Sequence, residues 1–109
     1  MIRVVIGRRD SYINMFRVSG HAEYDDYGKD IICSAMSMLA INTVNSLQFI
    51  ADETFDIEQD EDEGLISAAF DHKPNEKAEV LLAAFELGVQ GVIDQYGNEF
   101  VSLVYETSE

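Results

Sequence analysis

The sequence predicts an α+β protein, a single domain spanning residues 1–109 in which a mixed sheet of about five strands carries two helices on one face. Two long stretches repeat apolar residues at the three- and four-residue spacing of a helix, and five short stretches alternate apolar and polar residues as strands do. The chain is 47% hydrophobic, enough for one packed core, and its 109 residues fall within the usual size of one domain.

The first part of the chain is predicted to form a hairpin followed by a loop. Apolar and polar residues alternate over residues 2–6 and 12–19, with a turn at residues 8–11 between them. Residues 20–29 are bounded by glycines, are rich in polar and aromatic residues, and have no regular period. We expect them to form a mobile loop that could open for a peptide and close over it.

The first helix is predicted from residue 31 to about residue 50, with Asp30 as its N-cap. The side chains expected on its inner face recur at helical spacing: Ile32, Met36, Leu39, Ala40, Thr43, Leu47 and Ile50. A second hairpin is expected from strands at residues 54–58 and 65–70, joined by the acidic turn at residues 60–64.

The second helix is predicted to begin after Pro74, with Asn75 as its cap, and to end at Gly97. Its inner face is expected to carry Ala78, Leu81, Leu82, Phe85, Val89, Val92, Ile93 and Tyr96. Residues 99–105 form the last predicted strand. The order is therefore β-β-α-β-β-α-β, and two amphipathic helices are most simply accommodated together on one face of the sheet.

The net charge narrows the classes of partner. Twenty-one acidic and seven basic side chains give a formal charge of −14, which repels phosphate backbones and anionic lipid. Direct binding to nucleic acid or to a membrane is therefore not expected, whereas a basic protein would be attracted; a role in solubility alone is the alternative. A cytoplasmic location is expected, because the sequence shows neither a signal-peptide core nor roughly 18 consecutive apolar residues.

The single cysteine, Cys33, cannot form an internal disulfide or a multi-thiolate metal site, and we expect neither a metal nor a cofactor. With Asp30 as the cap, Cys33 would be the third helical residue. Unpaired N–H groups and the helix dipole stabilise a thiolate there and could bind an oxyanion. His21, twelve residues earlier, could return a proton to a leaving amine. On these residues alone, a lone cysteine is more often a packed core side chain than a nucleophile.

Other polar residues near this segment have open roles. Asp30 could orient His21, although an aspartate before an apolar helical run is usually only a cap. Ser34 and Ser37 could donate hydrogen bonds into a site or bond to their own helix backbone. His72, close to Pro74, is expected to be a surface loop residue.

A resemblance to a known family rests on residues 20–46. The segments Gly20-His21-Ala22 and Tyr27-Gly28-Lys29-Asp30-Ile31-Ile32-Cys33-Ser34-Ala35, followed by Ser37 and Asn45-Ser46, closely resemble the ribosomal-processing cysteine protease family, also called Prp or YsxB-like. The order and spacing of these residues are specific, and the resemblance in length and element order covers the whole chain. Ser34 departs from the alanine that is common after the cysteine in the family.

The resemblance implies that His21 and Cys33 form a catalytic dyad, with possible support from Gly28, Asp30 and Ser34. It implies an endopeptidase that removes a short N-terminal extension from the large-subunit ribosomal protein twenty-seven. That extension presents an apolar, paired-phenylalanine segment ahead of the cut. It also implies a homodimer with a flexible loop over the site. Three side chains could contact the substrate, although packing explains each equally well: Tyr24, Tyr27 and Met36.

Two other classes of function stay open. The chain could be a non-catalytic acidic module that binds a basic ribosomal protein and keeps Cys33 only for packing. It could also be a thiol redox sensor, which the lack of a second, resolving cysteine disfavours. The reactivity of the Cys33 thiol toward an alkylating agent separates the enzyme from the binding module.

Overall fold

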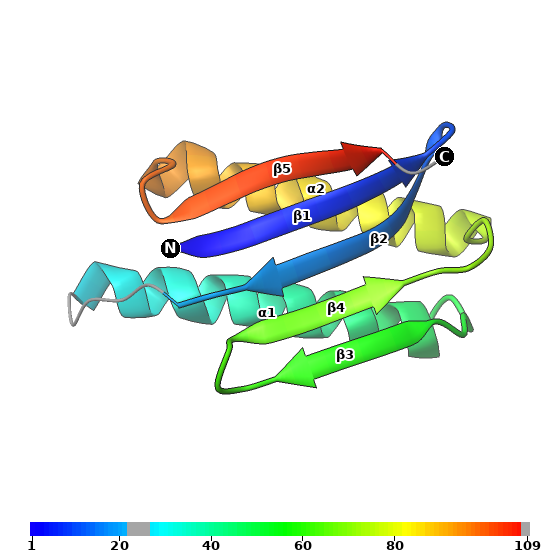
Figure 1. The fold of residues 1–109 in the computed structure, drawn as a ribbon, viewed down its shortest axis with the longest axis horizontal. Helices are drawn as coiled ribbons and strands as arrows, with labels where there is room; N and C mark the ends of the chain where they lie inside the picture. Colours follow the sequence, from blue (N-terminus) through cyan, green and yellow to red (C-terminus); the bar gives the residue numbers. More distant parts are fainter. Residues whose placement is uncertain (22–26, 108–109) are drawn as a thin grey trace.

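The predicted order of elements is confirmed by the computed structural model, which describes the backbone of residues 1–21 and 27–107, and the side chains of these residues except 27–30. The strands and helices are β1 (Ile2–Arg9), β2 (Tyr12–Ser19), α1 (Tyr27–Phe49), β3 (Asp56–Asp60), β4 (Leu65–Ala69), α2 (Glu76–Tyr96) and β5 (Val101–Thr107). Both helices lie on the same face of one sheet, as expected (Figure 1).

The sheet is mixed, with strand order β3-β4-β2-β1-β5. β1 pairs antiparallel with β2 and parallel with β5, so the last strand of the chain lies beside the first. β4 pairs antiparallel with β2 and with β3, which joins the second hairpin to the first. Because of this order, the turn between β3 and β4 lies at the same end of the sheet as the residues that follow β2 (Figure 1).

The core fills the space between the sheet and the two helices. The rings of Phe16 on β2 and Phe85 on α2 are 4.3 Å apart and fully buried, at 0% and 2% exposure. Both predicted helix faces are largely confirmed by burial. Ile50 is an exception, at 57% exposed, because α1 ends at Phe49 and Ile50 lies beyond the helix. Tyr96, in the last turn of α2, is also exposed.

The predicted start of the first helix is wrong. α1 begins at Tyr27, so Asp30 lies within its first turn and is not the N-cap. Residues 27–29 belong to the helix rather than to the expected loop, and residues 22–26 of that loop lie outside the described part of the chain. A glycine such as Gly28 favours a loop, but it costs only about 1 kcal/mol in a helix interior and does not prevent helix formation.

Smaller boundary differences affect the edge strands. The third strand spans Asp56–Asp60 instead of residues 54–58, and the last spans Val101–Thr107 instead of residues 99–105. The second helix begins as predicted, since the Asn75 side chain accepts a hydrogen bond from the backbone N–H of Ala78 at 2.9 Å.

One segment, Ile31–Phe49 of α1, is long and apolar enough to cross a membrane by length and composition alone. The central helix of a folded domain passes the same test, and this segment has that position here. Ile32, Met36 and Leu47 on its inner face are at most 2% exposed and pack in the core.

Candidate active site

His21 directly follows β2 and is held by main-chain groups from two distant segments. Its carbonyl oxygen accepts a hydrogen bond from the N-terminal ammonium of Met1 at 2.9 Å. Its ring Nε2 lies 3.1 Å from the carbonyl oxygen of Asp62, in the turn between β3 and β4. The preceding residue, Gly20, donates its N–H to the carbonyl oxygen of Glu63 at 3.0 Å. The position of the histidine is therefore set by the second hairpin as well as by β2.

The turn that meets His21 is held by its own first residue. The Asp60 Oδ1 accepts the backbone N–H groups of Asp62 at 3.0 Å and Glu63 at 3.4 Å. Gly64 closes the turn in the left-handed region, with φ at +58°, a conformation that favours glycine. An acidic run that looks like an ordinary solvated turn in the sequence thus has a defined conformation beside His21.

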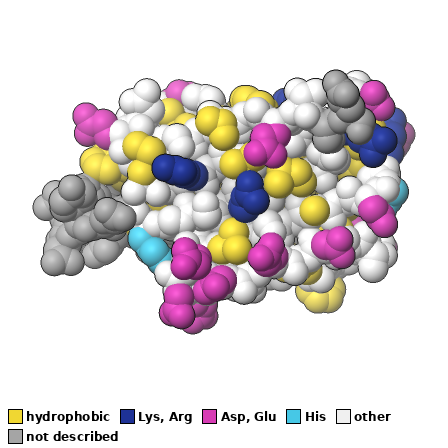
Figure 2. Space-filling model, in the orientation of Figure 1, with side chains coloured by type: hydrophobic (Ala, Val, Ile, Leu, Met, Phe, Trp, Pro, Cys, Tyr) yellow, Lys and Arg dark blue, Asp and Glu magenta, His cyan; other side chains and the backbone are white. Residues whose placement is uncertain are grey.

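A cleft of about 260 Å³ lies between α1 and this hairpin. His21 lines it together with Ser37 and Ile41 of α1 and residues 59–61 and 64–66 of the hairpin. Its lining is mixed: Ile41, Leu65 and Ile66 are apolar, and the acidic Asp60 and Glu61 lie at the turn. Acidic side chains also gather along one edge of the face shown in Figure 2.

Cys33 lies on the same face of α1 as two residues that line the cleft. Ser37 and Ile41 follow it by four and eight residues, a spacing that stacks side chains along one helix face. The cysteine is half-buried and packs against the edge of the core. Among the described residues that line the cleft, Ser37 is the one nearest to Cys33 along α1. The cleft therefore brings His21 together with the helix face on which Cys33 lies.

The expected position of Cys33 within the helix is wrong. It is the seventh residue of α1 rather than the third, since the helix begins at Tyr27. Only the first four N–H groups of a helix lack an intrahelical partner, and Cys33 is six residues, about 9 Å along the axis, beyond the first residue. The first-turn N–H groups are thus not beside its sulfur, and the effect of the dipole falls off within that turn.

The remaining predicted residues have different outcomes. Ser34 is exposed on α1. Met36 is 1% exposed and packs in the core. It therefore has the packing role that was the alternative to a substrate contact. Gly28 and Asp30 lie in the first turn of α1, as does Tyr27, but the structure does not describe their side chains, so the contact between Asp30 and His21 stays a prediction. Tyr24 lies outside the described residues.

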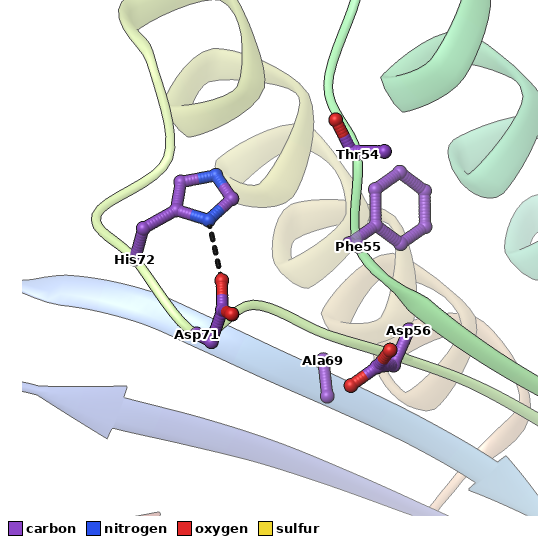
Figure 3. Close-up of a pocket in the computed structure, with 6 residues that line it drawn as sticks. All are labelled: Thr54, Phe55, Asp56, Ala69, Asp71 and His72. Carbon is purple, nitrogen blue, oxygen red and sulfur yellow. Dashed lines mark hydrogen bonds and ion pairs between the residues drawn. The ribbon is translucent and has the colours of Figure 1, made fainter.

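The other histidine, His72, forms a cluster with two carboxylates that the sequence does not predict. His72 is exposed, as predicted, but its Nδ1 lies 2.8 Å from Asp71 Oδ1 and its Nε2 lies 2.8 Å from Glu53 Oε1. It borders a cavity of about 320 Å³ with Thr54, Phe55 and other residues (Figure 3). The hydrogen bonds that the ring donates to Asp71 and to Glu53 raise the pKa of His72, with the one to Asp71 contributing most. Glu53 is distant in sequence, so no local pattern identifies this cluster.

The carboxylates of this cluster shift in the opposite direction. Burial raises the pKa of Glu53, but hydrogen bonds from the backbone N–H of Asn75 and from His72 outweigh it, and the net pKa is lowered. The hydrogen bond to His72 lowers the pKa of Asp71. No three His, Cys, Asp or Glu side chains within the described part of the chain come together as metal ligands.

The sequence and the fold both match known proteases. Residues 1–101 match the family of the cysteine protease Prp. The chain is 28% identical over 89 residues to the ribosomal processing cysteine protease Prp of Staphylococcus aureus, covering 82% of this chain and 83% of the relative. A crystal structure of a Streptococcus mutans protein superposes with a TM-score of 0.88 at 33% identity, covering 99% of this chain and 96% of that one.

A crystal structure of the Staphylococcus aureus protease, in complex with a covalently linked product peptide, superposes with a TM-score of 0.87 at 28% identity and covers 97% of this chain and all of that one. The family match and the fold of the present chain agree with the cleft that joins His21 to the helix of Cys33. This chain therefore belongs to the Prp family of ribosomal-processing cysteine proteases.

Proposed function

We propose that this chain is an endopeptidase that removes the N-terminal extension of the large-subunit ribosomal protein twenty-seven, using Cys33 as nucleophile and His21 as its proton partner. The observation that carries the proposal is the shared cleft, which His21 lines from one side and the Ser37 face of α1 from the other. Cys33 lies one helical turn before Ser37 on that face.

The proposed chemistry is a two-step acyl transfer. The Cys33 thiolate attacks the scissile carbonyl carbon, and the resulting tetrahedral intermediate collapses to a thioester as His21 gives a proton to the departing amine. Water, activated by the neutral His21, then hydrolyses the thioester, and the thiolate is restored. A covalent protease–peptide species is what such a mechanism produces, and the Staphylococcus aureus relative has been crystallised with a covalently linked product peptide.

The lining of the cleft suits the proposed substrate. Ile41, Leu65 and Ile66 offer apolar surface for the apolar segment expected ahead of the cut. Glu61 at the turn, and a chain with a formal charge of −14, favour the approach of a basic ribosomal protein. The apolar lining therefore provides affinity for the substrate, and the acidic surface raises the rate at which the substrate and the protease meet.

We also propose that the protease acts in the cytoplasm, where ribosomal proteins are made.

We further propose that the protease forms a homodimer. The sheet face opposite the helices supports a dimer interface (Figure 2). Exposed Arg3 and Arg17 lie on its central strands, and exposed Asp56 and Glu58 lie on its edge strand. A two-fold pairing of two such faces could bring the arginines of one protomer onto the acidic strand of the other. Sedimentation analysis of Arg17→Glu against the unchanged protein tests this: a monomeric variant supports the interface, and an unchanged dimer contradicts it.

The test of the proposed function uses the full-length ribosomal protein and mass measurement of the products. The unchanged protease is expected to yield one product lacking the N-terminal extension, and Cys33→Ala none. Ser34→Ala, which alters the adjacent exposed residue, is the matched control and is expected to cleave. An intact substrate after prolonged incubation with the unchanged protease would contradict the proposed activity, and cleavage by Cys33→Ala would remove that residue from the mechanism.

A further inference from the structure

We propose that the β3–β4 turn, residues 60–64, is a positioning element that determines which ring nitrogen of His21 takes part in proton transfer. The inference rests on the proposed role of His21 and adds a second hairpin to the machinery of the site. It assigns positioning roles to Asp60 and Gly64, neither of which touches the reacting atoms.

The hydrogen bond between His21 and Asp62 fixes the tautomer. A carbonyl oxygen can only accept, so the Nε2 that lies 3.1 Å from the Asp62 oxygen must carry a proton. In the neutral ring, Nδ1 therefore holds the lone pair. It follows that Nδ1 is the nitrogen that exchanges a proton with the Cys33 sulfur and with the departing amine.

The Asp62 carbonyl is in turn held in place by the Asp60 side chain. Its Oδ1 accepts the N–H groups of Asp62 and Glu63, at 3.0 and 3.4 Å, and so fixes the conformation of the turn. The Glu63 carbonyl then accepts the N–H of Gly20 at 3.0 Å, which ties the turn to the residue preceding the histidine. The backbone and the ring of the histidine segment are thus bound to the same turn.

Gly64 permits the close approach of the turn to the ring. A Cβ atom at this position would lie 2.5 Å from the Gly20 carbonyl oxygen and 2.9 Å from His21 Cε1, both too close for real contacts. Its φ of +58° is also unfavourable for other residues. Any side chain at this position would therefore push the turn away from the histidine.

The first arm of the test compares two variants of Asp60 in the cleavage assay. Asp60→Asn keeps an oxygen that can accept both turn N–H groups, whereas Asp60→Ala removes it. Because small misplacements of a catalytic group cost up to about a hundredfold in rate, Asp60→Ala is expected to lower kcat by about tenfold or more, and Asp60→Asn by less than about threefold. Both variants lose the charge at the cleft, so a change in KM common to both reports on substrate binding alone. Equal kcat values for the two variants would overturn the proposal.

The second arm is a spectroscopic measurement that needs no substrate. Nitrogen-15 NMR in alkaline buffer, where histidine rings are neutral, is expected to show the proton of His21 on Nε2 in the unchanged protein and a mixture of tautomers in Asp60→Ala. His72, at the other end of the sheet, serves as the internal reference and should not change between the two. A proton on Nδ1 of His21 in the unchanged protein would overturn the proposal. Failure of the unchanged protein to cleave the ribosomal protein would instead count against the proposed function, which the tautomer does not address.

Discussion

The two histidines of the chain lie at opposite ends of the sheet in different surroundings. His21 follows the end of β2, and His72 comes shortly after the end of β4, which is antiparallel to β2 (Figure 1). The ring of His21 meets a main-chain carbonyl oxygen at 3.1 Å, on the wall of a cleft. The ring of His72 lies between two carboxylates, each at 2.8 Å.

The difference shows how the same side chain can be given different tasks. Two carboxylates engage both nitrogens of His72 and raise its pKa, which favours the charged ring and a fixed connection between two loops. A neutral carbonyl adds no full charge and orients the ring of His21 through one nitrogen, so the other nitrogen can serve in proton transfer. Under the proposed mechanism His21 has the catalytic role, and we expect a structural role for His72.

The largest expected effect separates the two histidines by activity. His21→Ala is expected to lower the rate of cleavage by about 10³-fold or more, because residues that act as one catalytic unit show losses of at least this order. His72→Ala should keep the rate within about twofold, as a surface change away from the cleft. Steady-state cleavage of the ribosomal protein measures both. Similar losses in the two variants would contradict the division of roles.

The next effect concerns stability at the His72 end. Glu53 is 9% exposed in its side chain and accepts hydrogen bonds from His72 and, at 2.7 Å, from the backbone N–H of Asn75, the cap of α2. Glu53→Ala is expected to lower the free energy of unfolding by about 1–3 kcal/mol, since it leaves the Nε2 of His72 and the backbone N–H of Asn75 without their acceptor. Urea unfolding measures this. Glu99→Ala, at an exposed position in the turn before β5, is the control and should change stability by less than about 0.5 kcal/mol.

A smaller loss is expected for His72→Ala, at about 0.5–1 kcal/mol, because the ring is exposed and its ion pairs are screened by solvent. Urea unfolding in low salt and in high salt measures it, and the loss should shrink in high salt. An unchanged stability in low salt would show that the two ion pairs of His72 contribute nothing.

The smallest expected effect is the pH dependence of the stabilisation that His72 provides. The pKa of His72 is raised from its ordinary value of 6.5, so its stabilisation is full below pH 6.5 and is lost as the pH rises through the folded-state pKa. The pKa of Glu53 is lowered from 4.5, so its stabilisation is present above pH 4.5 and is lost as the pH falls through the folded-state pKa. The difference in unfolding free energy between the unchanged protein and His72→Ala should therefore be largest between pH 4.5 and 6.5. A difference that grows above this window would contradict the cluster.

The order of elements could be predicted because each depends on local patterns. Alternation and helical spacing identified the strands and helices, and Asn75 marked the start of α2. The start of α1 could not be located in this way, since its first turn carries Gly28 and no regular apolar spacing. The order of strands in the sheet depends on pairing between distant segments, and the parallel contact of β1 with β5 has no local signal.

In the candidate site, too, the sequence predicts local features but not contacts between distant segments. The types and spacing of His21 and Cys33 were visible in the sequence, as was the acidic turn. The hydrogen bond from the ring to the Asp62 carbonyl was not, because it joins residues 41 positions apart through main-chain atoms that every residue has. A left-handed Gly64 at the end of the turn was the single local feature of this contact.

The most direct test of the central claim, that His21 acts together with the Cys33 thiol, is the rate at which a small alkylating agent modifies Cys33 at neutral pH. The unchanged protein and His72→Ala are expected to react alike, and His21→Ala about tenfold or more slowly, because an imidazolium nearby stabilises the reactive thiolate. If all three proteins were alkylated at one rate, or only after denaturation, Cys33 and His21 would not form a catalytic pair.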